Sequence, residues 1–257
     1  MVNIPLKFPP RMLHNFQSFH TCNKNDKPKA TVIEFVGPPG AGKSTNSQVL
    51  SELLKSKGVR VCELQDIKRY VRELGFPERL LVLLKLVFVK SPGIVYYMLT
   101  LAAYRIYSIN SVYRFLRLII FDLALQQLRK NLCIDVVVLE QWIIQELWSA
   151  TIFKLDSYTN IGKHLSRFYF KSDLVFYLDI DSNTASERIG SRKSNLSRFD
   201  LMPPKQRIEE LQKYNTYLFQ LFENSTCSHK LFSKGYDRPE INAAVFLHHL
   251  DKKLNPN

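Results

Sequence analysis

The stretch Gly37-Pro38-Pro39-Gly40-Ala41-Gly42-Lys43-Ser44-Thr45 decides the fold. It fits the pattern G-x-x-x-x-G-K-[ST], in which a glycine-rich turn brings backbone N–H groups close to phosphate oxygens. The run Thr31 to Val36 precedes it and is typical of a buried strand. The residues after it have the apolar spacing of a helix that ends near Gly58. Strand, turn and helix are the context that the pattern requires, so the sequence predicts a nucleotide-phosphate loop over Gly37 to Thr45.

Each part of this loop has an expected task. The helix that starts near Lys43 directs its positive N-terminal end at the bound anion. Lys43 is expected to reach the β- and γ-phosphates, and the Ser44 hydroxyl is expected to ligate Mg²⁺. ATP and Mg²⁺ are therefore the ligands that this segment favours.

The composition bounds the class of protein. The chain has 257 residues, of which 46% are hydrophobic, enough to bury the core of one domain with a mobile lid. The formal net charge of +13 favours phosphorylated ligands, nucleic acid or anionic membrane surfaces and does not choose among them. The positive charges are spread along the chain without a recognised nucleic-acid motif, which argues against nucleic acid.

The cysteines and the N-terminal residues indicate in which cellular compartment the protein is expected. Cys22, Cys62, Cys133 and Cys227 lie far apart without a C-x-x-C pair, a spacing that favours buried thiols over a disulfide or a zinc site. Residues 1–30 contain no continuous apolar core of a signal peptide and are interpreted as an N-terminal extension. Both features favour the cytoplasm.

Further strands and helices alternate along residues 31–257. The sequence predicts short strands at Arg60–Leu64, Asp135–Glu140, Leu174–Asp179 and Lys230–Ser233. Helices are expected between the strands, including Pro204–Asn224 and a last helix from Pro239 to about Leu254. This alternation predicts an α/β domain of three layers, with a five-stranded parallel sheet.

Residues 76–130 read as three helices inserted between the second and third strands. The segment is unusually apolar and aromatic, but basic residues interrupt it before any run becomes long enough to span a bilayer. Packing in the core, packing against a second copy in a homodimer, and peripheral contact with a membrane all remain open.

Two carboxylates follow predicted strands. Asp66 is either the N-cap of the next helix or a group that orients an acceptor hydroxyl. Glu140 ends an apolar strand and is either a surface residue or a group that holds Mg²⁺ or positions the acceptor, provided that its strand neighbours the one before the loop. Both are candidate catalytic residues, and Glu140 joins Ser44 as a candidate for the metal site.

Residues 190–203 are predicted to form a polar lid after a helix that Ser182 or Asn183 caps. Arg192 and Arg198 on this segment are candidates to close over the nucleotide and neutralise the transferring phosphoryl group. The alternative is a solvated basic loop.

Taken together, these pieces resemble the P-loop nucleoside and nucleotide kinases, most closely the thymidylate kinase-like group. Four segments carry the resemblance: Gly37 to Thr45, the strand ending at Glu140, Ala185 to Arg192, and Ser197 to Asp200. The resemblance implies ATP with Mg²⁺ as donor and phosphoryl transfer to a small acceptor, either a nucleoside monophosphate or a related non-nucleotide compound. It also implies that residues 76–130 lie on the acceptor side, and that Arg192 and Arg198 close on the donor.

One segment departs from the family. The group carries an arginine soon after the third strand, whereas this chain has Glu140-Gln141-Trp142. The acceptor side is therefore expected to differ from that of a thymidylate kinase. The alternative function is a P-loop ATPase or GTPase that acts as a switch or assembly protein without a small-molecule acceptor.

Overall fold

The computed structural model describes residues 30–73, 109–152, 172–192, 199–235 and 237–254. The N-terminal extension, residues 76–108 of the predicted insert, and Arg198 lie outside these ranges.

A five-stranded parallel sheet with the order β2-β3-β1-β4-β5 forms the centre of the fold. Its strands are β1 Thr31–Val36, β2 Val61–Glu63, β3 Val136–Leu139, β4 Leu174–Asp179 and β5 His229–Lys234. The first four strands are almost wholly buried, which explains why they read as continuous apolar runs in the sequence. The predicted α/β fold with a five-stranded parallel sheet is confirmed.

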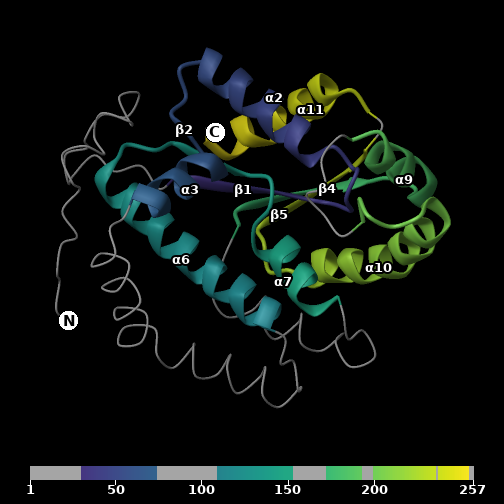
Figure 1. Ribbon diagram of the computed structural model, residues 1–257. Helices are drawn as coiled ribbons and strands as arrows, with labels where there is room; N and C mark the ends of the chain where they lie inside the picture. Colours follow the sequence, from purple (N-terminus) through teal and green to yellow (C-terminus); the bar gives the residue numbers. More distant parts are fainter. Residues whose placement is uncertain (1–29, 74–108, 153–171, 193–198, 236, 255–257) are drawn as a thin grey trace.

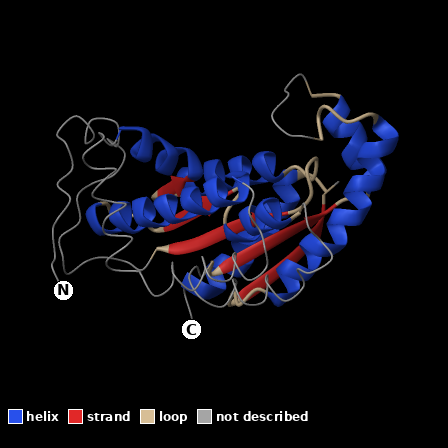
Figure 2. Cartoon of the chain, turned by 60° about the horizontal axis from the view of Figure 1, so that its bottom comes forward, coloured by secondary structure: helices blue, strands red, loops and turns tan. Residues whose placement is uncertain are grey.

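Helices cover both faces of this sheet. Their bounds are α2 Lys43–Ser56, α3 Leu64–Glu73, α6 Ile109–Asn131, α7 Ile143–Thr151, α9 Ser182–Gly190, α10 Pro204–Asn224 and α11 Pro239–Leu254. In Figure 1, α2 and α11 lie together on one face, and α6, α7 and α10 lie on the other. Figure 2 shows the strands as the middle layer between the helices. The three-layer arrangement follows because each strand of a parallel sheet needs a crossover connection to the next.

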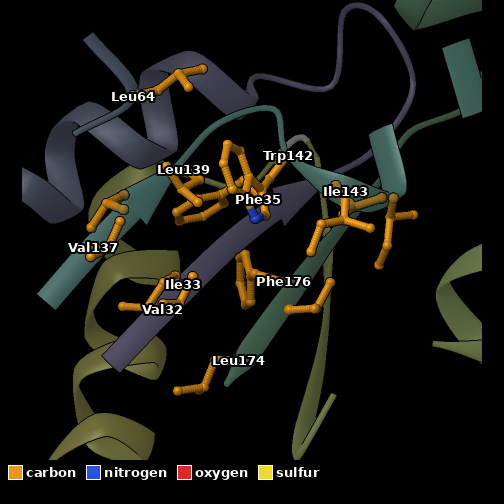
Figure 3. Close-up of a cluster of buried hydrophobic side chains, with 14 of the residues drawn as sticks. Val32, Ile33, Phe35, Leu64, Val137, Leu139, Trp142, Ile143, Leu174 and Phe176 are labelled. Atoms are coloured by element: carbon orange, nitrogen blue, oxygen red, sulfur yellow. The ribbon is translucent and has the colours of Figure 1, made fainter. Parts of the chain in front are cut away.

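Three phenylalanines anchor the layer between β1, β4 and α11. Phe35 and Phe176 meet edge to face with ring centroids 5.5 Å apart, and both pack against Phe246 of α11. Figure 3 shows Phe35 and Phe176 in the surrounding cluster, together with Leu139 and Trp142. Trp142 is 3% exposed, so the segment that follows β3 is anchored in the core.

Helix α6 is the part of the apolar insert that the structure describes. Helix α6 buries Leu118, Leu125 and Leu128 and packs against α3 and α7. None of the helices described by the structure has the length and apolar character needed to cross a bilayer. Core packing therefore accounts for these three leucines, whereas contact of the insert with a second copy or with a membrane stays a prediction.

Two local expectations are wrong. Asp181, not Ser182 or Asn183, caps α9, because its carboxylate accepts hydrogen bonds from the N–H groups of Asn183 and Thr184. Cys133 is disulfide-bonded, although its spacing from the other cysteines favoured a free thiol. Cys62 and Cys227 are free.

Candidate functional site

The predicted phosphate-binding loop, Gly37 to Thr45, follows the carboxyl end of β1, the central strand of the sheet. Strand β1 pairs in parallel with β3 on one side and with β4 on the other. The condition under which Glu140 would lie beside the loop is therefore met, because β3 ends at Leu139, directly before Glu140. The carboxyl edge of a parallel sheet is where open α/β proteins bind their ligands.

Gly40 is required by its surroundings. Its φ of 89° lies in the left-handed region, and a Cβ atom at this position would lie 2.8 Å from the carbonyl oxygen of Ala185. Helix α9 thus packs directly on the backbone of the loop. Only a residue without a side chain fits both the turn and this close approach.

The amino end of α2 is open to an anion. Gly42 is its N-cap, and no side chain among the described residues caps it. The first N–H groups of the helix therefore remain available, and they add to the positive end of the helix dipole. This is the arrangement expected of a phosphate site.

Asn46 fastens the loop to the last helix. Its amide nitrogen donates to the Gly42 carbonyl oxygen at 2.9 Å, and its amide oxygen accepts from Asn242 of α11, also at 2.9 Å. Both asparagines are buried. The conformation of the loop thus depends on contacts from β1, α9 and α11 at once.

Lys43 lies folded into the loop. Its ammonium group donates to the carbonyl oxygens of Gly37 at 2.7 Å and Pro38 at 2.9 Å, and the residue is only 8% exposed. Its pKa is lowered to about 7, mainly by burial and in addition by the positive charge of Arg192, while the carboxylate of Glu140 partly opposes this shift. Three residues that the sequence assigned to the site therefore act on one another electrostatically.

Ser44 and Glu140 line the same pocket. It has a volume of about 400 Å³ and lies between α2 and the carboxyl ends of β2 and β3. Ser44 is exposed in the first turn of α2, and Glu140 follows β3. A hydroxyl and a carboxylate are hard oxygen ligands of the kind that Mg²⁺ prefers, so this pair fits the metal that the sequence predicted.

Asp66 occupies a different place from the one predicted. Helix α3 starts at Leu64, so Asp66 lies within its first turn rather than at the N-cap. Its carboxylate accepts from the Glu63 N–H at 2.9 Å, and burial raises its pKa. Its neighbours Glu63 and Gln65 line the pocket beside Ser44. Contact between Asp66 and an acceptor stays a prediction.

The lid is described only at its edges. Arg192 is exposed just after α9, and its positive charge contributes to the lowered pKa of Lys43. Its closure on the donor stays a prediction. Arg198 lies outside the described residues, so its role stays a prediction.

Sequence reasoning missed two residues that shape the site. Arg188 of α9 donates to the carbonyl oxygens of Gly235 and Gly40, at 2.7 and 3.4 Å, and so ties the phosphate-binding loop to the loop after β5. Arg188 is the basic residue in the last turn of α9. The sequence shows this position, but it does not show that the side chain reaches two glycine-containing loops.

The second is Glu34 in the middle of β1. It is 1% exposed, and its carboxylate accepts from the Ile144 N–H and from the Ser172 hydroxyl, each at 2.9 Å. Burial raises its pKa to about 7. Glu34 thus caps the amino end of α7 from a neighbouring strand and fixes the helix that follows Glu140. An acidic residue inside an otherwise apolar strand was the available signal.

No protein-family model matches the sequence, and no curated protein matches it. Among solved structures, the chain is similar in fold to deoxyadenosine kinase from M. mycoides with bound dATP, at 18% identity and a TM-score of 0.45, over 86% of this chain and 100% of that one. It is also similar to shikimate kinase from Acinetobacter baumannii in complex with shikimate, at 16% identity and a TM-score of 0.43, over 91% and 100% of the two chains. Shikimate kinase from Bacteroides thetaiotaomicron matches at 10% identity with the same TM-score, over 86% and 98%. At identities of 18% or less and TM-scores of 0.45 or less, these likenesses assign no activity to this chain.

Proposed function

We propose that this protein transfers the terminal phosphoryl group of ATP to a small-molecule acceptor, as a P-loop kinase of the thymidylate kinase-like type. The observation that carries the proposal is the pocket shared by Ser44 and Glu140 beside the phosphate-binding loop. A switch protein needs the loop but has no need of a small-molecule pocket there. A kinase needs both, because donor and acceptor must lie side by side.

The donor is held by the loop. The free N–H groups at the start of α2 bind the phosphates, and Lys43 turns from the carbonyl oxygens of Gly37 and Pro38 to the β- and γ-phosphates. The phosphate charge favours the protonated form of Lys43 and so compensates for its burial. Mg²⁺, held by Ser44 and Glu140, would neutralise charge on the same phosphates.

In the transfer step, an acceptor hydroxyl oxygen attacks the γ-phosphorus of ATP. The bond between that phosphorus and the oxygen bridging to the β-phosphate breaks, and ADP leaves with the electron pair. The hydroxyl proton passes to solvent, with the Glu140 carboxylate positioned to accept it first. Arg192 neutralises charge on the transferring group from the lid side, and Arg198 is proposed to join it on closure.

Acceptor-dependent ADP release tests this proposal. Lys43→Ala is expected to abolish release while the circular dichroism spectrum and melting temperature stay close to those of wild type. Glu140→Gln is expected to lower kcat by about 10²-fold or more with little change in the Kd for ATP. Gln141→Ala, an exposed neighbour, is the control. ATP hydrolysis at the same rate with and without every acceptor would contradict the kinase and favour the switch.

A further inference from the structure

The pocket beside Ser44 has a polar helical wall. On α2, Ser44, Ser47 and Ser51 recur at the spacing of one helix face and line the pocket together. The positions of Ser44 and Ser51 are two turns apart, about 10 Å along the helix axis. A pocket of about 400 Å³ with this length accommodates a molecule of the size of a nucleoside or a disaccharide.

Ser51 has an unused hydrogen-bonding group. It is 1% exposed, and its hydroxyl finds no hydrogen-bond partner among the described residues. Ser47, by contrast, donates to the Ser44 carbonyl oxygen at 3.0 Å within the helix. A buried hydroxyl without a partner costs stability, and a ligand in the pocket can supply the partner once the Ser51 side chain rotates toward it.

The charged side chains that line the pocket are mostly acidic. Three carboxylates line it, those of Glu52, Glu63 and Glu140. Among the described lining residues the one cation is Lys55, and it is paired with Glu63. At the end away from Glu140, which is proposed to hold Mg²⁺, a phosphate group on the acceptor would face the carboxylates of Glu52 and Glu63, whereas hydroxyl groups can donate to these carboxylate oxygens.

We infer that the acceptor is an uncharged molecule with several hydroxyl groups, and that Ser51 binds a hydroxyl remote from the one that is phosphorylated. The inference rests on the proposed function and narrows its acceptor to a class without a phosphate group. The reacting hydroxyl lies at the Ser44 and Glu140 end, next to the donor. Ser51 is a binding residue at the other end and takes no part in the chemistry.

The test compares matched pairs of acceptors in an ADP-release assay with wild-type protein. The pairs are thymidine and thymidine monophosphate, adenosine and adenosine monophosphate, and trehalose and trehalose phosphate. A neutral member is expected to be used, with kcat/KM exceeding that of its phosphorylated partner. Transfer to the phosphorylated members instead overturns the inference and leaves the kinase standing. ATP binding with no release of ADP on any of these compounds counts against the proposed function itself.

The variant Ser51→Ala then tests whether the acceptor contacts Ser51. It is expected to raise the KM for the neutral acceptor about three- to tenfold, with kcat and the KM for ATP unchanged. Its melting temperature should equal or exceed that of wild type, because the hydroxyl it removes has no hydrogen-bond partner in the part of the chain that the structure describes. Ser56→Ala, on the exposed end of the same helix, is the matched control. An unchanged acceptor KM in Ser51→Ala overturns the assignment.

A second variant tests the charge argument independently of Ser51. Glu52→Lys is expected to narrow the preference for the neutral over the phosphorylated member by about two- to fivefold. Glu52 is exposed and its carboxylate accepts from Gln48 on the same helix, so the fold does not depend on it. An unaltered preference would show that these carboxylates do not select the acceptor.

Discussion

The guanidinium group of Arg188 donates a 2.7 Å hydrogen bond to the carbonyl oxygen of Gly235. The same nitrogen also reaches the carbonyl oxygen of Gly40 in the phosphate-binding loop. One side chain of α9 therefore holds together two loops at the carboxyl edge of the sheet, one after β1 and one after β5.

Replacing Arg188 tests this tie. Arg188→Ala is expected to weaken ATP binding about ten- to a hundredfold, because hydrogen bonds from a charged group to both loops are lost. Isothermal titration of ATP measures the Kd, and Glu187→Ala, an exposed neighbour on the same helix, is the control. Equal affinities for ATP in wild type and Arg188→Ala would show that the hydrogen bonds of Arg188 to the two loops have no role in ATP binding.

Gly40 and Gly58 form a matched pair for a test of the loop. Both have left-handed φ values, 89° and 78°, but a Cβ atom at Gly58 would meet nothing within 4 Å. Gly58→Ala is therefore expected to cost about 1 kcal/mol of unfolding free energy and to leave ATP binding intact. Gly40→Ala adds a clash with the Ala185 backbone and should abolish ATP binding. Chemical denaturation and titration of ATP measure the two effects, and similar results for both variants would contradict the close packing of α9 on the loop.

The pKa of Lys43 can be followed directly in the free protein. An NMR titration of isotope-labelled lysine side chains is expected to show one lysine with a midpoint of about 7 instead of the ordinary 10.5. Because the Glu140 carboxylate raises this pKa, Glu140→Gln should move the midpoint to lower pH. Glu63→Gln is the control, and Lys43→Arg identifies the signal. A midpoint near the ordinary value would mean that Lys43 is not buried as described.

Glu34 predicts a pH dependence of stability. Its pKa is about 7 in the folded protein and 4.5 without burial, so between these values the folded state holds a proton that the unfolded state has released. Its contribution to stability is therefore present in full below about pH 4.5 and is lost as the pH rises through 7. The loss amounts to about 3 kcal/mol.

Glu34→Gln removes this titration and retains an oxygen that accepts from the Ile144 N–H. Its unfolding free energy relative to wild type is expected to rise by about 3 kcal/mol from pH 4.5 to pH 8. Urea denaturation at several pH values measures the difference, with the exposed Glu187→Gln as control. A difference that stays constant with pH would show that Glu34 is ionised throughout.

The sequence predicted those parts of the site whose structure depends on residues close together along the chain. The loop, the strand before it and the helix after it follow from local pattern, and β1, β4, α10 and α11 have the expected bounds. Glu140 was identified because a carboxylate directly after an apolar strand can be recognised from the sequence alone. Glu140 lies near the loop only because β1 and β3 are adjacent in the sheet. The sequence alone did not predict which strands are adjacent.

The features that the sequence did not predict depend on contacts between segments that are distant along the chain. Glu34 looked like one polar residue in an apolar strand, and only the fold brings it to the N–H groups of α7. The disulfide at Cys133 could not be read from spacing, because pairing depends on distance in the fold rather than along the chain. With that disulfide, the cysteines no longer argue for a reducing compartment.

The hydrogen bond between Asn46 and Asn242 joins residues separated by 196 positions. Closing so long a segment carries a large entropic cost that is recovered only when the strands between them have assembled. During synthesis the loop sequence emerges from the ribosome first, and its bracing partner follows 196 residues later. A nascent chain therefore carries the sequence of the loop well before it carries the helix α11 that braces the loop through Asn46.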